Sequence, residues 1–168
     1  RMTTKASIPP GTVYTVEHIR GGKVLSRDVY HNLVPIEGLN HIASVVTKGA
    51  AQVPTWYIGL FEGNYTPVPA DTAAAFSAAA TECTTYAPST RAEFNEGAVV
   101  AGVVDNTGNR AEFTFTAAKT IYGAFMSSAQ AKGAVTGTLI SAARFGSPKA
   151  ALVDDVLRIT ASLGFGSA

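Results

Sequence analysis

Acidic residues and histidine are missing from a long part of this chain, residues 113–153. The only charged side chains there are those of Lys119, Lys132, Arg144 and Lys149, and around them run Phe, Tyr, Ile, Val, Thr, Ala and Gly. General acid–base catalysis needs a group that exchanges protons near neutral pH, and this part of the chain offers none. The composition is typical of structural β-sheet, so we expect a protein that is not an enzyme.

Charge is also scarce across the whole sequence. Charged residues make up 15% of the chain, hydrophobic residues make up 46%, and the formal net charge is +1. Ordinary soluble domains contain about a quarter charged residues. Weak charge lowers the repulsion between copies, so we expect a homo-oligomer, with a trimer as one option. The lack of a basic run argues against a nucleic-acid partner, and the lack of a long apolar run argues against a membrane span.

Metal ligands and nucleophiles are few. Cys83 is the single cysteine, which excludes an intrachain disulfide and predicts a small buried thiol. His18, His31 and His41 lack the short spacing of a zinc site. The chain has neither a Gly-x-Ser-x-Gly elbow nor a glycine-rich loop followed by a helix, which phosphate binding requires. We therefore expect no catalytic residue, no cofactor and no metal site.

The beginning of the chain differs from the rest. Residues 1–11 include Ile8, Pro9 and Pro10 but few residues that could form a core. Proline stiffens the backbone and removes a hydrogen-bond donor, so we expect an extended N-terminal arm that lies over a neighbouring subunit. A frayed terminus is the alternative. Residues 12–168 are most simply one β-rich domain, because their number is sufficient for a core without disulfides or metals.

Strand patterns dominate the first half of that domain. Residues 13–19 and 24–30 alternate between apolar and polar side chains on either side of Gly21-Gly22. Paired glycines supply the positive φ of a tight turn, so these two runs predict a β-hairpin. Residues 56–61 are apolar without alternation, which is typical of a strand buried on both faces.

Two short helices are expected between the strands. Apolar residues with helical spacing, from Ile36 to Val46, predict a helix over 36–47 that ends before Gly49. Asp71 is expected to cap a second short helix that runs through Ala80. Residues 81–96 show no regular pattern and predict a long loop.

The last part of the chain reads as short strands separated by turns. The expected strands cover residues 98–104, 111–116, 121–127, 136–145 and 156–163. The pair Asp154-Asp155 predicts the turn before the final strand, and Gly146-Ser147-Pro148 predicts the end of another. Regularly spaced short strands predict a mainly β fold: a single-domain antiparallel β-sandwich, or a jelly-roll-like arrangement, with one or two short helices.

Aromatic side chains allow one binding function. Trp56 and Tyr122 lie in apolar runs, and we expect them in the core or at a subunit interface. Tyr65 and Tyr86 lie in expected loops, where they are candidates for contact with an external partner. Together with Tyr57, these rings also allow a sugar-stacking platform, as in β-sandwich lectins.

Three stretches carry a family resemblance. They are residues 31–42, HNLVPIEGLNHI; residues 56–63, WYIGLFEG; and TIYGAF at 120–125 together with GAVTGTL at 133–139. Their order and spacing resemble a group of small virion proteins from tailed bacteriophages, over roughly residues 29–163. Members of that group are structural proteins, some of which are suspected to decorate the capsid or to belong to the tail.

The resemblance implies a non-enzymatic structural component of a virion. We expect a capsid decoration protein, or cement protein, that lies on the capsid surface and stabilises the shell through contacts with the major capsid protein and with its own copies. The residues expected to make these contacts are Ile8, Pro9, Pro10, Tyr65, Tyr86 and Arg91. A tail- or fibre-associated structural protein is the first alternative, and a glycan-binding module for host adhesion is the second.

Overall fold

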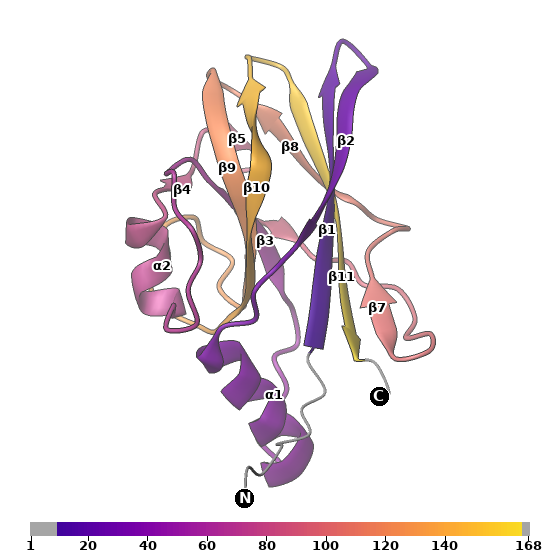
Figure 1. The fold of residues 1–168 in the computed structure, drawn as a ribbon, viewed down its shortest axis with the longest axis vertical. Helices are drawn as coiled ribbons and strands as arrows, with labels where there is room; N and C mark the ends of the chain where they lie inside the picture. The colour runs from indigo at the N-terminus through magenta and orange to yellow at the C-terminus, as the bar shows by residue number, and fades with distance from the viewer. Residues whose placement is uncertain (1–9, 166–168) are drawn as a thin grey trace, which may run out of the picture.

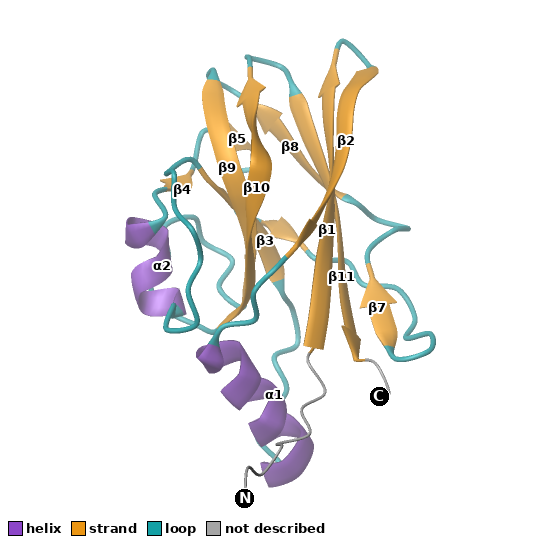
Figure 2. Cartoon of the chain, viewed as in Figure 1, coloured by secondary structure: helices purple, strands orange, loops and turns teal. Residues whose placement is uncertain are grey.

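Two antiparallel sheets pack face to face in the computed structural model of the chain, which describes residues 10–165 (Figure 1 and Figure 2). The larger sheet has the strand order β2-β1-β11-β8-β5, with β7 beside β11, and the smaller sheet has the order β10-β9-β3-β4, with β6 beside β3. This arrangement confirms the predicted antiparallel β-sandwich with two short helices.

The elements follow one another along the chain with these bounds: β1 Pro10–Arg20, β2 Lys23–His31, α1 Ile36–Lys48, β3 Tyr57–Phe61, α2 Ala73–Ala79, β4 Glu82–Cys83, β5 Tyr86–Ala87, β6 Ala92–Glu93, β7 Val103–Asp105, β8 Ala111–Phe115, β9 Lys119–Ser127, β10 Leu139–Ala151 and β11 Val156–Phe165.

The predicted hairpin is confirmed as β1 and β2. Gly21 and Gly22 form its turn with φ values of 54° and 75°, a region that glycine enters without steric cost. β1 then pairs along its length with β11. This long central pair forms the middle of the larger sheet.

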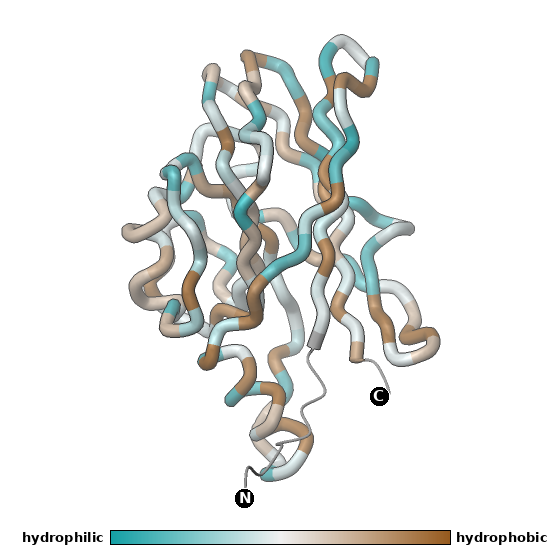
Figure 3. Tube along the Cα trace, viewed as in Figure 1, coloured by the Kyte–Doolittle hydropathy of each residue, from teal (hydrophilic) through white to brown (hydrophobic). Residues whose placement is uncertain are grey.

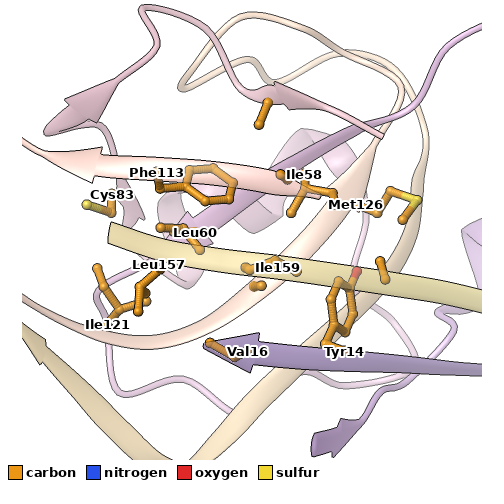
Figure 4. Close-up of a cluster of buried hydrophobic side chains, with 14 of the residues drawn as sticks. Tyr14, Val16, Ile58, Leu60, Cys83, Phe113, Ile121, Met126, Leu157 and Ile159 are labelled. Carbon is orange, nitrogen blue, oxygen red and sulfur yellow. The ribbon is translucent and has the colours of Figure 1, made fainter. Parts of the chain in front are cut away.

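The core lies between the two sheets (Figure 4). Alternate residues of β1 and β11 point inward, so that Val16 and Ile159 meet Ile58 and Leu60 of β3, all of them fully buried. Burial of one such side chain stabilises a fold by about 1.5–3 kcal/mol. Cys83 lies in the same core, as predicted, and burial raises the pKa of its thiol.

A third layer covers the outer face of the smaller sheet. In the register of β3 and β9, Gly59 lies opposite Phe125 and Phe61 lies opposite Gly123. Each phenyl ring occupies the space that the opposite glycine leaves free: a Cβ added at Gly59 would lie 2.6 Å from Cε1 of Phe125. Phe76 of α2 packs on both rings, at 5.7 Å from Phe61 and 5.1 Å from Phe125 between ring centroids. The two Gly-x-Phe segments therefore build the seat for α2.

The helix predicted over 36–47 is confirmed as α1, which ends at Gly49 with φ 66°. Gly38 is its only buried residue, and a Cβ there would lie 3.0 Å from the Ile140 Cα, so the helix lies close against β10. Its apolar stripe, by contrast, faces largely outward: Ile36 is 53% and Val46 is 76% exposed.

Asp71 does not cap α2, contrary to the sequence prediction. Its carboxylate accepts hydrogen bonds from the Tyr65 hydroxyl and from the Val68 backbone N–H within its own loop. The backbone N–H of Ala73 instead donates to Glu37 of α1 at 2.9 Å. A carboxylate from a distant element thus takes the place of a local cap.

Three strand predictions need correction. The expected loop over 81–96 contains the short strands β4, β5 and β6. The expected strand over 98–104 is confined to β7, because reciprocal hydrogen bonds between Val100 and Val103 close a tight turn before it. Finally, β10 does not end at 146–148 but continues to Ala151, with an irregular register between Arg144 and Lys149.

Candidate functional site: the base of the sandwich

Two of the predicted contact residues lie in the interior. Tyr86 belongs to β5, is 3% exposed and packs edge-to-face on Phe113 at 4.9 Å between ring centroids. Arg91 is 2% exposed. The prediction of an exposed loop around these residues was therefore wrong, and their side chains face the interior of this chain rather than a partner.

Arg91 forms a buried ion pair instead. Its Nε and Nη2 donate to the two carboxylate oxygens of Glu82 at 2.8 and 2.7 Å, and its Nη1 donates to the Ala129 carbonyl at 2.9 Å. Gly133 N–H also donates to Glu82, at 2.8 Å. A guanidinium group pairs with a carboxylate in this forked geometry with high specificity. The pair fixes the connection between β9 and β10 against β4, which is a structural role.

Tyr65 is half-buried, and its hydroxyl donates to Asp71 Oδ1 at 2.6 Å. This hydrogen bond, together with burial, raises the pKa of Tyr65 to about 12. The ring also packs edge-on against Phe76. Both the hydroxyl and one edge of the ring are therefore engaged within the chain.

The expected arm falls mostly outside the described residues. Ile8 and Pro9 lie there, whereas Pro10 and Gly11 belong to β1, with Pro10 opposite Phe165 of β11. The strand thus begins within the range that the sequence assigned to the arm.

The stretches that carried the family resemblance meet in one place. Glu37 from the first stretch accepts hydrogen bonds from Ala73 N–H and, at 2.6 Å, from Leu139 N–H in the last stretch. It thereby joins the start of α1 to α2 and β10. The second stretch supplies Gly59 and the last stretch also supplies Gly123, and both glycines face the phenyl rings described above. These residues build the fold.

One end of the sandwich is held by a charged cluster. This upper end carries the β1–β2 and β10–β11 turns, at the top of Figure 1. Asp155, 1% exposed, accepts hydrogen bonds from Arg20 Nε at 2.8 Å and Nη2 at 2.7 Å and from Leu152 N–H at 2.9 Å, and His18 Nε2 lies 2.8 Å from its Oδ2. Chiefly through the Arg20 hydrogen bonds, the pKa of Asp155 is held well below its ordinary value.

The outer face of the larger sheet is polar. Glu17 lies within 4 Å of the guanidinium groups of Arg27, Arg110 and Arg158, and Arg158 also pairs with Glu112. Exposed ion pairs of this kind contribute about 0–1 kcal/mol each, and they keep a sheet face solvated. This face is polar enough to remain in contact with water, without a further layer or a partner packed on it.

The opposite end of the sandwich, the base, exposes large apolar side chains. They come from the end of α1, from the turn before β7 and from the end of β11, and Figure 3 shows brown segments in α1 and in that turn. We define the base surface by its five exposed residues: Val46 at 76%, Val99 at 72%, Val100 at 69%, Val103 at 40% and Phe165 at 44%.

The base surface is hollowed between α1 and the turn before β7. One hollow of about 290 Å³ lies along α1 and reaches Phe165, and a second of about 360 Å³ lies along residues 94–104 and reaches Leu163. The two share a wall, and we call them together the base groove. The shared wall consists of Gln52, Val53, Trp56 and Ile140.

The lining of the base groove is mostly apolar. Its polar side chains are those of His41, Gln52 and Glu96, and the His41 ring lies edge-on to Trp56 at 5.6 Å between centroids. Trp56 is half-buried and packs against the core with its remaining surface. Sequence reasoning placed Trp56 in the core or at a subunit interface, and the groove beside it was missed because its walls come from five separate parts of the chain.

Within residues 10–165, no group of three or more His, Cys, Asp and Glu side chains has an arrangement that could hold a metal ion. No helix of this described part is both long and apolar enough to cross a membrane. No protein-family model matches the sequence, and no curated protein matches it. The base surface and its groove are therefore the candidate site on structural grounds alone.

Proposed function

We propose that this chain is a non-enzymatic structural protein of a tailed-phage virion, which decorates the capsid surface and docks there through its base surface. The observation that carries the proposal is the base surface itself, where valines and a phenylalanine lie exposed around an apolar groove. Apolar patches of this kind on soluble proteins mark sites of protein contact.

The interior supports a rigid building block. The Arg91–Glu82 pair and the Asp155–Arg20 pair each use charged side chains to fix turns and connections. Gly59 and Gly123 let aromatic rings close the outer layer of the smaller sheet. A rigid module that appears in many copies on a shell gains strong attachment from many weak contacts, because each copy raises the effective concentration of the next.

The sequence resemblance supports the class of protein rather than the mode of contact. The matching stretches contain Glu37, Gly59 and Gly123, and all three residues act inside the fold. The base surface uses Val46, Val99 and Phe165, which lie outside those stretches. We therefore propose that the stretches preserve the module and that the base determines what it binds, with the major capsid protein as the first candidate.

The proposal is tested by comparing the two ends of the sandwich. The base variant carries Val46→Gln and Val99→Gln, and the matched control carries Val24→Gln and Val153→Gln at the upper end, where both valines are 54% exposed. Each variant is added to phage particles assembled without the protein, and bound copies are counted after sedimentation. Docking would bury both valines, so their replacement should weaken binding of the base variant by roughly tenfold or more and should leave binding of the control unchanged.

Antibody labelling of intact particles then decides between head and tail. Label on the heads, together with DNA release at a lower temperature from particles that lack the protein, supports a decoration role. Label on the tails would replace it with the tail-associated alternative. Equal binding by the two double variants would remove the base surface as the contact, and absence of the wild-type protein from particles would overturn the virion role itself.

A further inference from the structure

The first residues of β1 enter the sheet at the edge of the base groove. Along β1 the inward positions are Thr12, Tyr14 and Val16, which are 3%, 0% and 0% exposed. Toward the base, Thr12 lies opposite Leu163 of β11 and Pro10 lies opposite Phe165. Both of these β11 residues line the groove. The inner row of the central strand pair therefore ends at the groove.

We propose that residues 1–9 of the chain lie in its own base groove, with Ile8 as the main apolar contact. Side chains two positions apart in an extended chain share a face, and Ile8 stands two positions before Pro10. An extended chain advances about 3.3 Å per residue, so residues 1–9 reach about 30 Å, which allows the segment to span both hollows. Met2 is the second large apolar residue of the segment.

The charges of the segment and the groove are opposite in sign, so they attract each other. Residues 1–9 carry Arg1 and Lys5 and no acidic residue. The one carboxylate in the groove lining is that of Glu96, on the side of residues 94–104. A basic segment with two apolar residues thus meets an apolar groove with an acidic side chain at its wall.

Attachment at the rim favours the chain's own segment over one from a neighbour. A segment tied to its site by a short connection has an effective concentration of about a millimolar, which a separate copy matches only at a comparable concentration. The sequence alone predicted an arm over a neighbouring subunit, and the pairing of Pro10 with Phe165 is the observation from which we propose the chain's own groove instead. The inference does not depend on the proposed virion function.

Trp56 provides the measurement, because it is the only tryptophan and it lines both hollows. The full chain is compared with a variant that lacks residues 1–9, and quenching of Trp56 fluorescence by acrylamide is recorded. Removal of the segment should shift the emission to longer wavelength and raise the quenching constant about twofold, since the groove then fills with water. A synthetic peptide of residues 1–9, added to the shortened chain, should reverse both changes in a saturable manner.

Point variants keep the test valid if the deletion disturbs folding. Ile8→Asp should reproduce the effect of the deletion. Ser7→Asp is the matched control: in the proposed extended arrangement, neighbouring positions take opposite faces, so this variant should leave the quenching unchanged. Far-UV circular dichroism confirms that each variant keeps its sheets.

Two results would overturn the inference. One is a quenching constant that is the same with and without residues 1–9 in folded protein. The other is an effect of the segment that disappears on about hundredfold dilution and is accompanied by a dimer in sedimentation, which would assign the groove to a second copy. Neither result bears on whether the protein is found on particles, so failure here and failure of the virion role are distinguishable.

Discussion

The two ends of the sandwich both expose apolar side chains, but they expose them on different shapes. At the upper end, Val24, Leu25, Leu152 and Val153 are 50–54% exposed, and they lie in or beside the β1–β2 and β10–β11 turns. At the base, exposed valines surround two hollows. Exposure alone therefore does not identify a docking site in this molecule, and the base is chosen because its exposed side chains surround two hollows.

The difference follows from how each end is connected. The upper end has short turns, and the buried carboxylate of Asp155 ties the end of β1 to the turn before β11. The base has longer connections, over residues 49–56 and 94–102, which cross the end of the core without regular pairing along their length. The two hollows lie along these connections.

The comparison of the two ends requires a rigid pair of sheets between them. Among the substitutions considered, Gly123→Ala should lower the free energy of unfolding most. The added Cβ would fall well inside van der Waals contact of the Phe61 ring and of the Ala143 carbonyl oxygen, and the backbone oxygen has no free rotamer. We expect a loss of about 3 kcal/mol in the free energy of unfolding, measured by urea denaturation. Gly108→Ala is the control, because no atom lies within 4 Å of its added Cβ, and it should change stability by less than about 0.5 kcal/mol. Equal stability of the two variants would contradict the ring-over-glycine packing.

Asp155→Asn should loosen the upper end and leave the base intact. The substitution keeps the shape of the side chain but removes the negative charge to which Arg20 and the Leu152 N–H donate hydrogen bonds. Hydrogen bonds to charged groups contribute about 1.5–3 kcal/mol, so we expect a loss of about 2–3 kcal/mol on urea denaturation. Asp154→Asn is the matched control: Asp154 is exposed with φ 66°, a conformation that asparagine adopts readily, and its change should be within about 0.5 kcal/mol. A similar loss in both variants would show that the buried cluster does not stabilise this end.

Acid should act on the same cluster. The pKa of Asp155 is lower in the folded protein than in the unfolded chain, so the unfolded chain binds more protons as the pH falls. The stabilisation is complete above about pH 4, the ordinary range of an aspartate, and is lost as the pH falls from there toward the folded pKa. Urea denaturation at several pH values below 5 should show a shallower fall in stability for Asp155→Asn than for the wild type. Parallel curves would place the acid sensitivity elsewhere, for example at Asp28, whose pKa the Lys149 hydrogen bond also lowers.

Much of the fold could be predicted because its determinants are local. Gly21-Gly22 forces a tight turn whatever surrounds it, and Gly49 ends α1 through its own backbone. The unbroken apolar run of β3 likewise predicted a strand buried on both faces, and the sandwich itself followed from repeated patterns of this kind. Such features depend on a few neighbouring residues, which the sequence displays directly.

The candidate site could not be predicted, because its determinants are distant in sequence. Arg91 lies in a stretch that predicted a loop, but its partners Glu82 and the Ala129 carbonyl come from other parts of the chain. Val99 and Val100 continued a strand pattern, but the turn at Ala101 and Gly102 makes them part of the base surface. The groove arises only when α1 and the connection after it, residues 94–104, Met126 of β9, Ile140 of β10 and the end of β11 come together, and no single stretch contains its pattern.

The smallest expected effect is on the stability of the double variants that separate the two ends. Val46→Gln with Val99→Gln at the base, and Val24→Gln with Val153→Gln at the upper end, replace side chains that are at least half exposed. Each pair should change the free energy of unfolding by no more than about 0.5 kcal/mol, since exposed substitutions lose little burial, and glutamine is a good helix former at position 46. Equal stability makes any difference in particle binding a property of the surface. A base variant that unfolds substantially more easily than the upper-end variant would instead mean that Val46 or Val99 supports the fold, and loss of binding would then no longer identify the base as the docking face.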